Sequence, residues 1–127
     1  MAISAAVRRL VRDRAENCCE YCGVSQAHIP FATFHVEHVI ARQHGGGDTE
    51  ENLCLACQWC NFFKGTNIAS IENAALVQLF YPRIHIWSDH FMRHGAEVKA
   101  LTAIGRVTVR LLKMNDDERR ELRGELT

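Results

Sequence analysis

Two pairs of cysteines, each with two residues between its members, most constrain how this chain can fold. Cys19 pairs with Cys22, and Cys57 pairs with Cys60. Two thiolates at this spacing in a tight turn converge on one ion, and two such turns complete a tetrahedral zinc site. Residues 23–56 separate the pairs, which is more than a plain zinc ribbon needs, so a folded segment must lie between them.

The chain has six cysteines, so the pairing has alternatives. Cys18 can replace Cys19, and a rival pair at the same spacing begins at Cys54. We favour Cys19 because Gly23, which follows its partner, suits a knuckle turn. Cys18 and Cys54 then pack as small apolar side chains. Buried free cysteines and a redox pair are the competing interpretations. With all four positions filled by cysteine, the zinc is structural and has no open position for water.

The composition favours one small domain in a reducing compartment. Of the 127 residues, 47% are hydrophobic, which is enough for one modest core and too many for a disordered chain. A domain of this size gains from a metal staple. No apolar run approaches the roughly 20 residues of a membrane span, and Arg8 and Arg9 interrupt any signal peptide. We therefore expect a cytoplasmic protein with no membrane partner, whose cysteines serve metal binding.

The charge balance excludes one class of DNA-binding protein. Lysine plus arginine number 15 and aspartate plus glutamate number 15, so the formal net charge is zero. This balance gives no global attraction to nucleic acid and argues against a sequence-independent DNA coat protein. An enzyme with a local basic cleft stays open. A run of arginines in the first expected helix favours a solvated face over a DNA-contacting one; its members are Arg8, Arg9, Arg12 and Arg14.

The first half of the chain predicts a helix followed by two strands and a second helix. Ser4 caps the first helix, which ends near Asn17. Residues 31–40 are rich in aromatic and β-branched types, which indicates a strand. A glycine-rich loop then leads to a second short strand over residues 53–57. A helix begins near residue 60 and ends near Gly65.

The second half of the chain predicts helices and one hairpin. Residues 71–80 have helical spacing. Residues 97–109 indicate a hairpin with its turn at Gly105. A final charged helix over residues 115–123 follows, capped by Asn115 or Asp116.

The segment around the cysteine pairs resembles the HNH endonuclease family. The family pattern is an acid, a histidine and two apolar residues, a Gly-Gly loop, Asn-Leu, and then CxxC-(His or Asn)-x-x-Lys. The matching residues are Glu37-His38-Val39-Ile40, Gly45-Gly46-Gly47, Asn52-Leu53 and Cys57-x-x-Cys60-Asn61-x-x-Lys64-Gly65. The upstream stretch from Cys19 to Gly23 is similar to the zinc-containing branch of the family. Residues 79–83 and 87–91, with Gly105-Arg106, are similar to the tail of a bacterial subgroup of small HNH proteins.

The resemblance covers about residues 17–66 and implies an α+β fold. Its centre is the ββα-metal (His-Me finger) core, held by the four-cysteine zinc staple. An N-terminal helix precedes this core, and a C-terminal hairpin plus helix follows it over about residues 71–127. We expect residues 1–127 to form a single HNH nuclease domain.

The resemblance also implies a role for each matching residue. His38 is the general base, because an imidazole titrates near neutral pH and can accept a proton from attacking water. Glu37 and Asn61 are ligands of a catalytic Mg²⁺ or Mn²⁺ ion. Asn52 bonds backbone across the loop and holds His38 in place. The candidates for phosphate contacts are Lys64, Arg42 and His44.

Two residues depart from the common family pattern. The acid is commonly aspartate, whereas the longer Glu37 shifts the carboxylate. Asn61 stands where many members have histidine, and an amide oxygen favours Mg²⁺ over Zn²⁺. The predicted function is a metal-dependent DNA endonuclease that leaves 5′-phosphate and 3′-hydroxyl ends. The alternative is a non-catalytic zinc-stapled module that binds nucleic acid, which the zero net charge favours and the presence of His38 disfavours.

Overall fold

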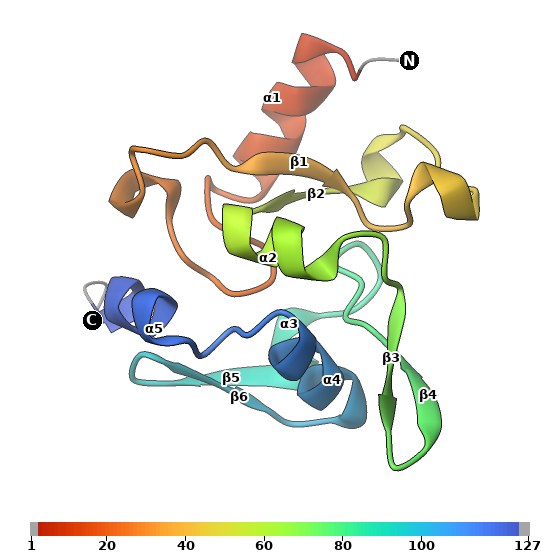
Figure 1. The fold of residues 1–127 in the computed structure, drawn as a ribbon. Coiled ribbons are helices and arrows are strands. Elements are labelled where there is room, and N and C mark those ends of the chain that lie inside the picture. Colours follow the sequence, from red (N-terminus) through yellow and green to blue (C-terminus); the bar gives the residue numbers. More distant parts are fainter. Residues whose placement is uncertain (1–2, 125–127) are drawn as a thin grey trace.

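The structure, a computed structural model, describes residues 3–124. Within this range, five α-helices and three two-stranded antiparallel sheets form a mixed fold (Figure 1). The predicted α+β class is therefore confirmed. No helix within residues 3–124 is long and apolar enough to cross a membrane.

Helix α1 (Ala5–Arg14) begins where the sequence predicts it. The hydroxyl of Ser4 accepts a hydrogen bond from the N–H of Val7 at 3.2 Å, which satisfies one of the free donors of the first turn. The helix ends at Arg14, earlier than Asn17, because the next residues leave the helical region. Glu16 has a φ of 52° and Asn17 a φ of 59°.

Two of the arginines on α1 hold the helix against the strands. Arg12 donates to the carbonyl of Phe34 at 3.0 Å, and Arg14 donates to the carbonyl of Leu53 at 2.7 Å. These guanidinium groups satisfy backbone acceptors inside the protein. Arg12 and Arg14 therefore make structural contacts, although Arg14 remains exposed, as Arg8 and Arg9 do.

The expected ββα arrangement is present. Strand β1 (His35–His38) pairs antiparallel with β2 (Leu53–Ala56), so that Glu37 lies opposite Cys54. Helix α2 (Gln58–Lys64) follows directly and lies against this hairpin (Figure 1). Strand β1 is shorter than the predicted 31–40.

The start of β1 is delayed because a side chain serves the backbone of the preceding loop. The amide of Gln26, in the 3-10 turn Gln26–His28, donates to the carbonyls of Ile29 and Ala32 at 2.8 and 2.7 Å. Its oxygen accepts from the N–H of Phe34 at 2.7 Å. These backbone groups are satisfied without a strand partner, so the loop continues to residue 34.

The prediction of a helix over residues 71–80 is wrong. Strands β3 (Ala69–Glu72) and β4 (Ala75–Gln78) form a hairpin there. Asn73 and Ala74 occupy its two-residue turn with φ of 51° and 63°. Two consecutive positive φ angles match the twist of a tight hairpin, and they break the helix that the apolar spacing favours.

The prediction of a hairpin turn at Gly105 is also wrong. The hairpin consists of β5 (Phe91–His94) and β6 (Glu97–Ala100), after the short helix α3 (Trp87–His90). Gly105 lies inside α4 (Ala103–Leu111). A Cβ atom there would lie 2.3 Å from the carbonyl oxygen of His90, so the glycine allows a close helix contact.

The final helix α5 (Asp117–Gly124) follows the prediction closely. Asp116 accepts the N–H of Arg119 at 2.9 Å, which makes it the capping side chain. The other candidate cap, Asn115, instead binds the backbone of Val98 through both ends of its amide. These bonds therefore tie the β5–β6 hairpin to the turn that precedes α5.

Candidate functional site

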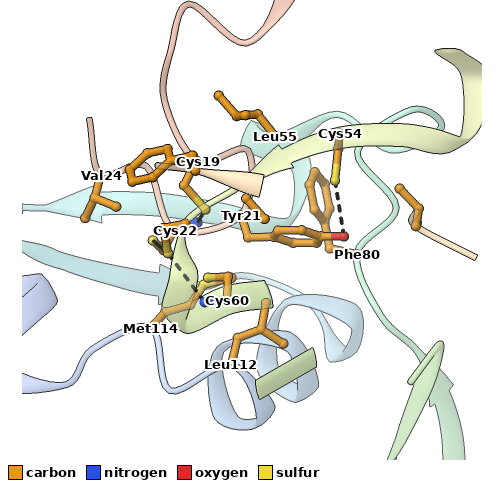
Figure 2. Packing of buried hydrophobic residues seen from close by; sticks show 14 of the residues in the cluster. Cys19, Tyr21, Cys22, Val24, Cys54, Leu55, Cys60, Phe80, Leu112 and Met114 are labelled. Atoms are coloured by element: carbon orange, nitrogen blue, oxygen red, sulfur yellow. Dashed lines mark hydrogen bonds between the residues drawn. The ribbon is translucent and has the colours of Figure 1, made fainter. Parts of the chain in front are cut away.

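The two cysteine pairs meet in one buried cluster. The sulfur atoms of the four residues all lie within 4.8 Å of one another, and Figure 2 shows three of them beside the apolar core. The N–H of Cys22 points to the sulfur of Cys19, and the N–H of Cys60 to that of Cys57, at 3.5 and 3.4 Å. Four soft thiolate donors in this arrangement fit a structural zinc ion. The alternatives Cys18 and Cys54 lie outside the cluster.

The first knuckle, which is the turn from Cys19 to Cys22, is hydrogen-bonded to β2. This strand leads directly into the second knuckle, the turn from Cys57 to Cys60. Gly23 adopts a φ of 83°, which completes the turn after Cys22. The N–H of Glu20 donates to the carbonyl of Leu55 at 2.9 Å, and the carboxylate of Glu20 accepts the N–H of Leu55 at 2.8 Å. This exchange fixes the distance between the two knuckles.

Two arginines of α5, Arg119 and Arg123, contact residues of the cysteine cluster, and both are fully buried. Arg119 donates to the sulfur of Cys60 at 3.2 Å. Arg123 donates to the carbonyl of Cys22 at 3.2 Å and to that of Met114 at 2.6 Å. A zinc ion with four thiolates carries a net charge of about −2, which two buried guanidinium groups can balance. Sequence analysis missed this role because the arginines look like the polar face of a charged helix.

We expect Arg119→Ala to destabilise the protein by about 3 kcal/mol, because it removes a buried cation from beside a thiolate. Arg120→Ala is the matched control, since Arg120 makes only an exposed ion pair with Asp117. Urea unfolding of the zinc-loaded proteins measures both effects. Equal stability of the two variants would contradict the role assigned to Arg119.

A separate pocket of about 370 Å³ opens beside β1 and α2. It brings together three residues that the sequence assigns to catalysis, Glu37, His38 and Asn61, and one assigned to phosphate, Arg42. The remaining lining residues are Val36, Ala41, Gln43, Gly65 and Thr66. The strand end, the following loop and the helix therefore meet at one solvent-accessible place.

Glu37 points into the protein and leaves one oxygen unused. Its Oε2 accepts the hydroxyl of Tyr21 at 2.8 Å, whereas no described residue bonds its Oε1. Burial raises the pKa of Glu37 to about 7, although Lys64 at 3.9 Å opposes this. A buried carboxylate oxygen without a partner is unfavourable, so Oε1 fits a hard divalent cation.

The structure corrects the prediction for Lys64. Its side chain is only 1% exposed, so it does not face a phosphate backbone. Its ammonium group instead donates to the carbonyl of Val39 at 2.9 Å and to that of His38 at 3.4 Å. Lys64 therefore ties the end of α2 to the end of β1 and balances part of the charge of Glu37.

The imidazole of His38 has a carboxylate partner, Asp48, which the sequence did not assign to the site. Nε2 of His38 lies 2.7 Å from Oδ1 of Asp48. The same oxygen accepts Nε of Arg42 at 2.9 Å. These two bonds, with that from His38 the stronger, lower the pKa of Asp48. The sequence signal that could have identified Asp48 is its position directly after three glycines, in the loop that follows His38. His44 is exposed on this loop and does not line the pocket.

Asn52 closes the loop between β1 and β2 with three backbone bonds. Its Oδ1 accepts the N–H of Ile40 at 2.9 Å, and its Nδ2 donates to the carbonyls of Ile40 and Gly47, both at 2.9 Å. The side chain is buried and does not line the pocket. Its contribution to the site is the shape of the loop that carries Asp48.

Gly46 is expected to be essential to this loop. A Cβ atom there would lie 1.7 Å from the carbonyl oxygen of Ile40 and 2.8 Å from Nδ2 of Asn52. We expect Gly46→Ala to displace the loop and to lower stability by about 1–3 kcal/mol. Gly47→Ala is the control, because a Cβ atom there meets nothing within 4 Å. Thermal unfolding of the two variants measures the difference, and equal midpoints would contradict this account of the loop.

One comparison with known proteins identifies this segment. Residues 19–66 match the HNH endonuclease family model. The match begins at the first cysteine of the cluster and includes Glu37, His38, Asn52 and Asn61, which confirms the resemblance seen in the sequence. Neither a curated protein nor a solved structure matches the chain.

Proposed function

From the HNH endonuclease match of residues 19–66, we propose that the chain is a metal-dependent endonuclease that hydrolyses phosphodiester bonds in DNA. The observation that carries the proposal is the pocket in which Glu37, His38 and Asn61 meet. A base and two oxygen donors in one accessible pocket are the parts that this reaction needs. The products would be 5′-phosphate and 3′-hydroxyl ends.

Glu37 and Asn61 would hold the catalytic ion, for which Mg²⁺ or Mn²⁺ suits the oxygen donors. When bound, the ion supplies stabilisation of the charge that develops on the phosphate and on the leaving oxygen. Tyr21 holds one oxygen of Glu37 and thereby directs the carboxylate.

His38 acts as the general base in this proposal. It takes a proton from the attacking water, and this requires a neutral imidazole with a free nitrogen near the phosphate. Its side chain is 19% exposed, so the ring is held by the protein and still reaches solvent. Arg42, which lines the same pocket, and His44 on the adjacent turn are proposed to contact the phosphate backbone.

The cysteine cluster serves as a scaffold and takes no part in the chemistry. All four zinc positions are occupied by protein thiolates, so a bound zinc keeps no site for water. The contacts of Arg119 and Arg123 with the knuckles support one domain over the whole chain. A cytoplasmic location is part of the proposal, because a reducing compartment keeps the thiols available for zinc.

Incubation of the zinc-loaded protein with supercoiled plasmid, with and without Mg²⁺ or Mn²⁺, tests the function. We expect nicked or linear DNA only in the presence of the divalent ion. Retarded migration of an uncut duplex at every metal concentration would instead favour the zinc-stapled nucleic-acid-binding module. If the protein neither cuts nor binds DNA, both functions are wrong.

A further inference from the structure

We propose that Asp48 is a positioning residue for the base: its carboxylate holds Nε2 of His38, so that the imidazole acts through Nδ1. This inference rests on the proposed function, since it assumes that His38 accepts a proton. It assigns a role to the loop residue that follows the three glycines. The side chains of His38, Asp48 and Arg42 support it through their geometry.

The contact between His38 and Asp48 determines which ring nitrogen is free. Nε2 lies 2.7 Å from Oδ1 of Asp48, a short distance typical of a charge-assisted hydrogen bond. An ionised carboxylate can only accept, so Nε2 must carry the proton. A neutral imidazole has a single N–H, and its other nitrogen, Nδ1, is therefore left with the lone pair that a base needs.

Arg42 holds the carboxylate in this orientation. Its Nε donates at 2.9 Å to the same Oδ1 that His38 contacts. The guanidinium group also balances the negative charge of Asp48, which would otherwise repel a phosphate near the pocket. The side chain of Arg42 is 52% exposed and that of Asp48 is 36% exposed, so the pair lies at the rim of the site and not in the core.

Hydrogen bonds from Asn52 hold the loop that carries Asp48 in the shape that brings its carboxylate to His38. Asn52 binds the backbone of Ile40 at one end of the loop and that of Gly47, next to Asp48, at the other. The loop begins directly after His38 and Val39 at the end of β1. Base and carboxylate therefore come from two ends of one closed loop, and Asn52 sets the spacing between them.

A purely structural role is the competing explanation, in which Asp48 only anchors the loop through Arg42. The two roles differ in what they change. A loop anchor affects the phosphate-contacting surface and therefore the KM for DNA. A positioning residue affects the tautomer of His38 and therefore kcat.

Nitrogen-15 NMR of the histidine side chains tests the proposal without any DNA cleavage. In the zinc-loaded protein without other divalent ions, we expect neutral His38 to carry its proton on Nε2. In Asp48→Ala, we expect a mixture of the two tautomers. An Nδ1-protonated His38 in the unsubstituted protein, or an unchanged tautomer in Asp48→Ala, would overturn the proposal.

Cleavage kinetics provide the second readout. We expect Asp48→Ala to lower kcat about 10- to 100-fold, as loss of a histidine's orienting partner does elsewhere, with little change in KM. Asp48→Asn keeps an acceptor oxygen and should recover part of kcat. Glu51→Gln, on the same loop, is the control. A loss confined to KM, or no loss, would refute the positioning role.

Zinc content and thermal unfolding establish that each variant is folded, and Asp48→Asn replaces Asp48→Ala if the latter is not. The endonuclease proposal and the positioning role of Asp48 can be refuted independently. If the unsubstituted protein cuts no DNA, the endonuclease proposal is wrong, and the NMR experiment still decides how His38 is held. If it cuts DNA and the Asp48 variants match it, only the positioning role is wrong.

Discussion

Removal of zinc with a strong chelator is expected to unfold this protein. The four cysteines of the cluster are buried and belong to the apolar core, where Figure 2 shows Cys19, Cys22 and Cys60 among its other members. A structural zinc ion contributes about 10–16 kcal/mol to folding in small zinc domains. This is comparable to the roughly 5–15 kcal/mol that a whole domain retains as net stability. The metal-free chain should therefore lose its cooperative fold.

Near-UV circular dichroism and the fluorescence of Trp59, which lies between two of the cysteines, report this transition. Metal analysis of the purified protein should give about one zinc ion per chain. Cys57→Ser should reproduce the effect of the chelator, whereas Cys18→Ser, outside the cluster, should leave the metal content unchanged. A zinc-free protein with an intact cooperative unfolding transition would contradict the assignment of the cluster.

We expect the substitution His38→Ala to cause a large loss of the DNA cleavage rate. Loss of a general base lowers the rate about 10²- to 10⁴-fold. Stability should change little, because the imidazole is partly exposed and its main partner, Asp48, can return to solvent. His94→Ala is the control, since His94 is exposed on the β5–β6 hairpin, away from the pocket. Initial rates of plasmid nicking in Mg²⁺ measure the effect, with zinc content and unfolding temperature as checks on the fold.

The sequence predicted the parts of the fold that local chemistry determines. The CxxC spacing and Gly23 indicated which four cysteines meet. The oxygen of Ser4 marked the start of α1, and Asp116 was one of two predicted caps for α5. The two cap signals and each CxxC spacing depend on residues within one turn of the chain, whereas the meeting of the two pairs was inferred from the four ligands that a zinc site needs.

The parts that sequence analysis missed depend on residues far apart in the chain. Gly105 was assigned to a turn because its close contact, the carbonyl of His90, is invisible without the packing of α4. Lys64 was assigned to phosphate because its position in the motif does not show that it is buried against β1. The apolar spacing of residues 71–80 suits a helix, and the turn at Asn73 overrides it.

In the candidate site, too, the sequence predicted some of the residues and missed others. The motif placed Glu37, His38 and Asn61 in one pocket, where the structure also brings them together. The groups that orient these residues were not predicted. Tyr21 comes from the turn between Cys19 and Cys22 and Asp48 from the glycine loop, and each contacts a residue of β1 that lies 10 or more positions away in the sequence.

The endonuclease function is tested by incubating the zinc-loaded protein and its His38→Ala variant with supercoiled plasmid at the same Mg²⁺ concentration. We expect divalent-dependent nicking by the unsubstituted protein and a rate at least about 100-fold lower for the folded variant. Equal nicking by the two proteins, or no nicking of any DNA by the unsubstituted protein, would contradict this expectation.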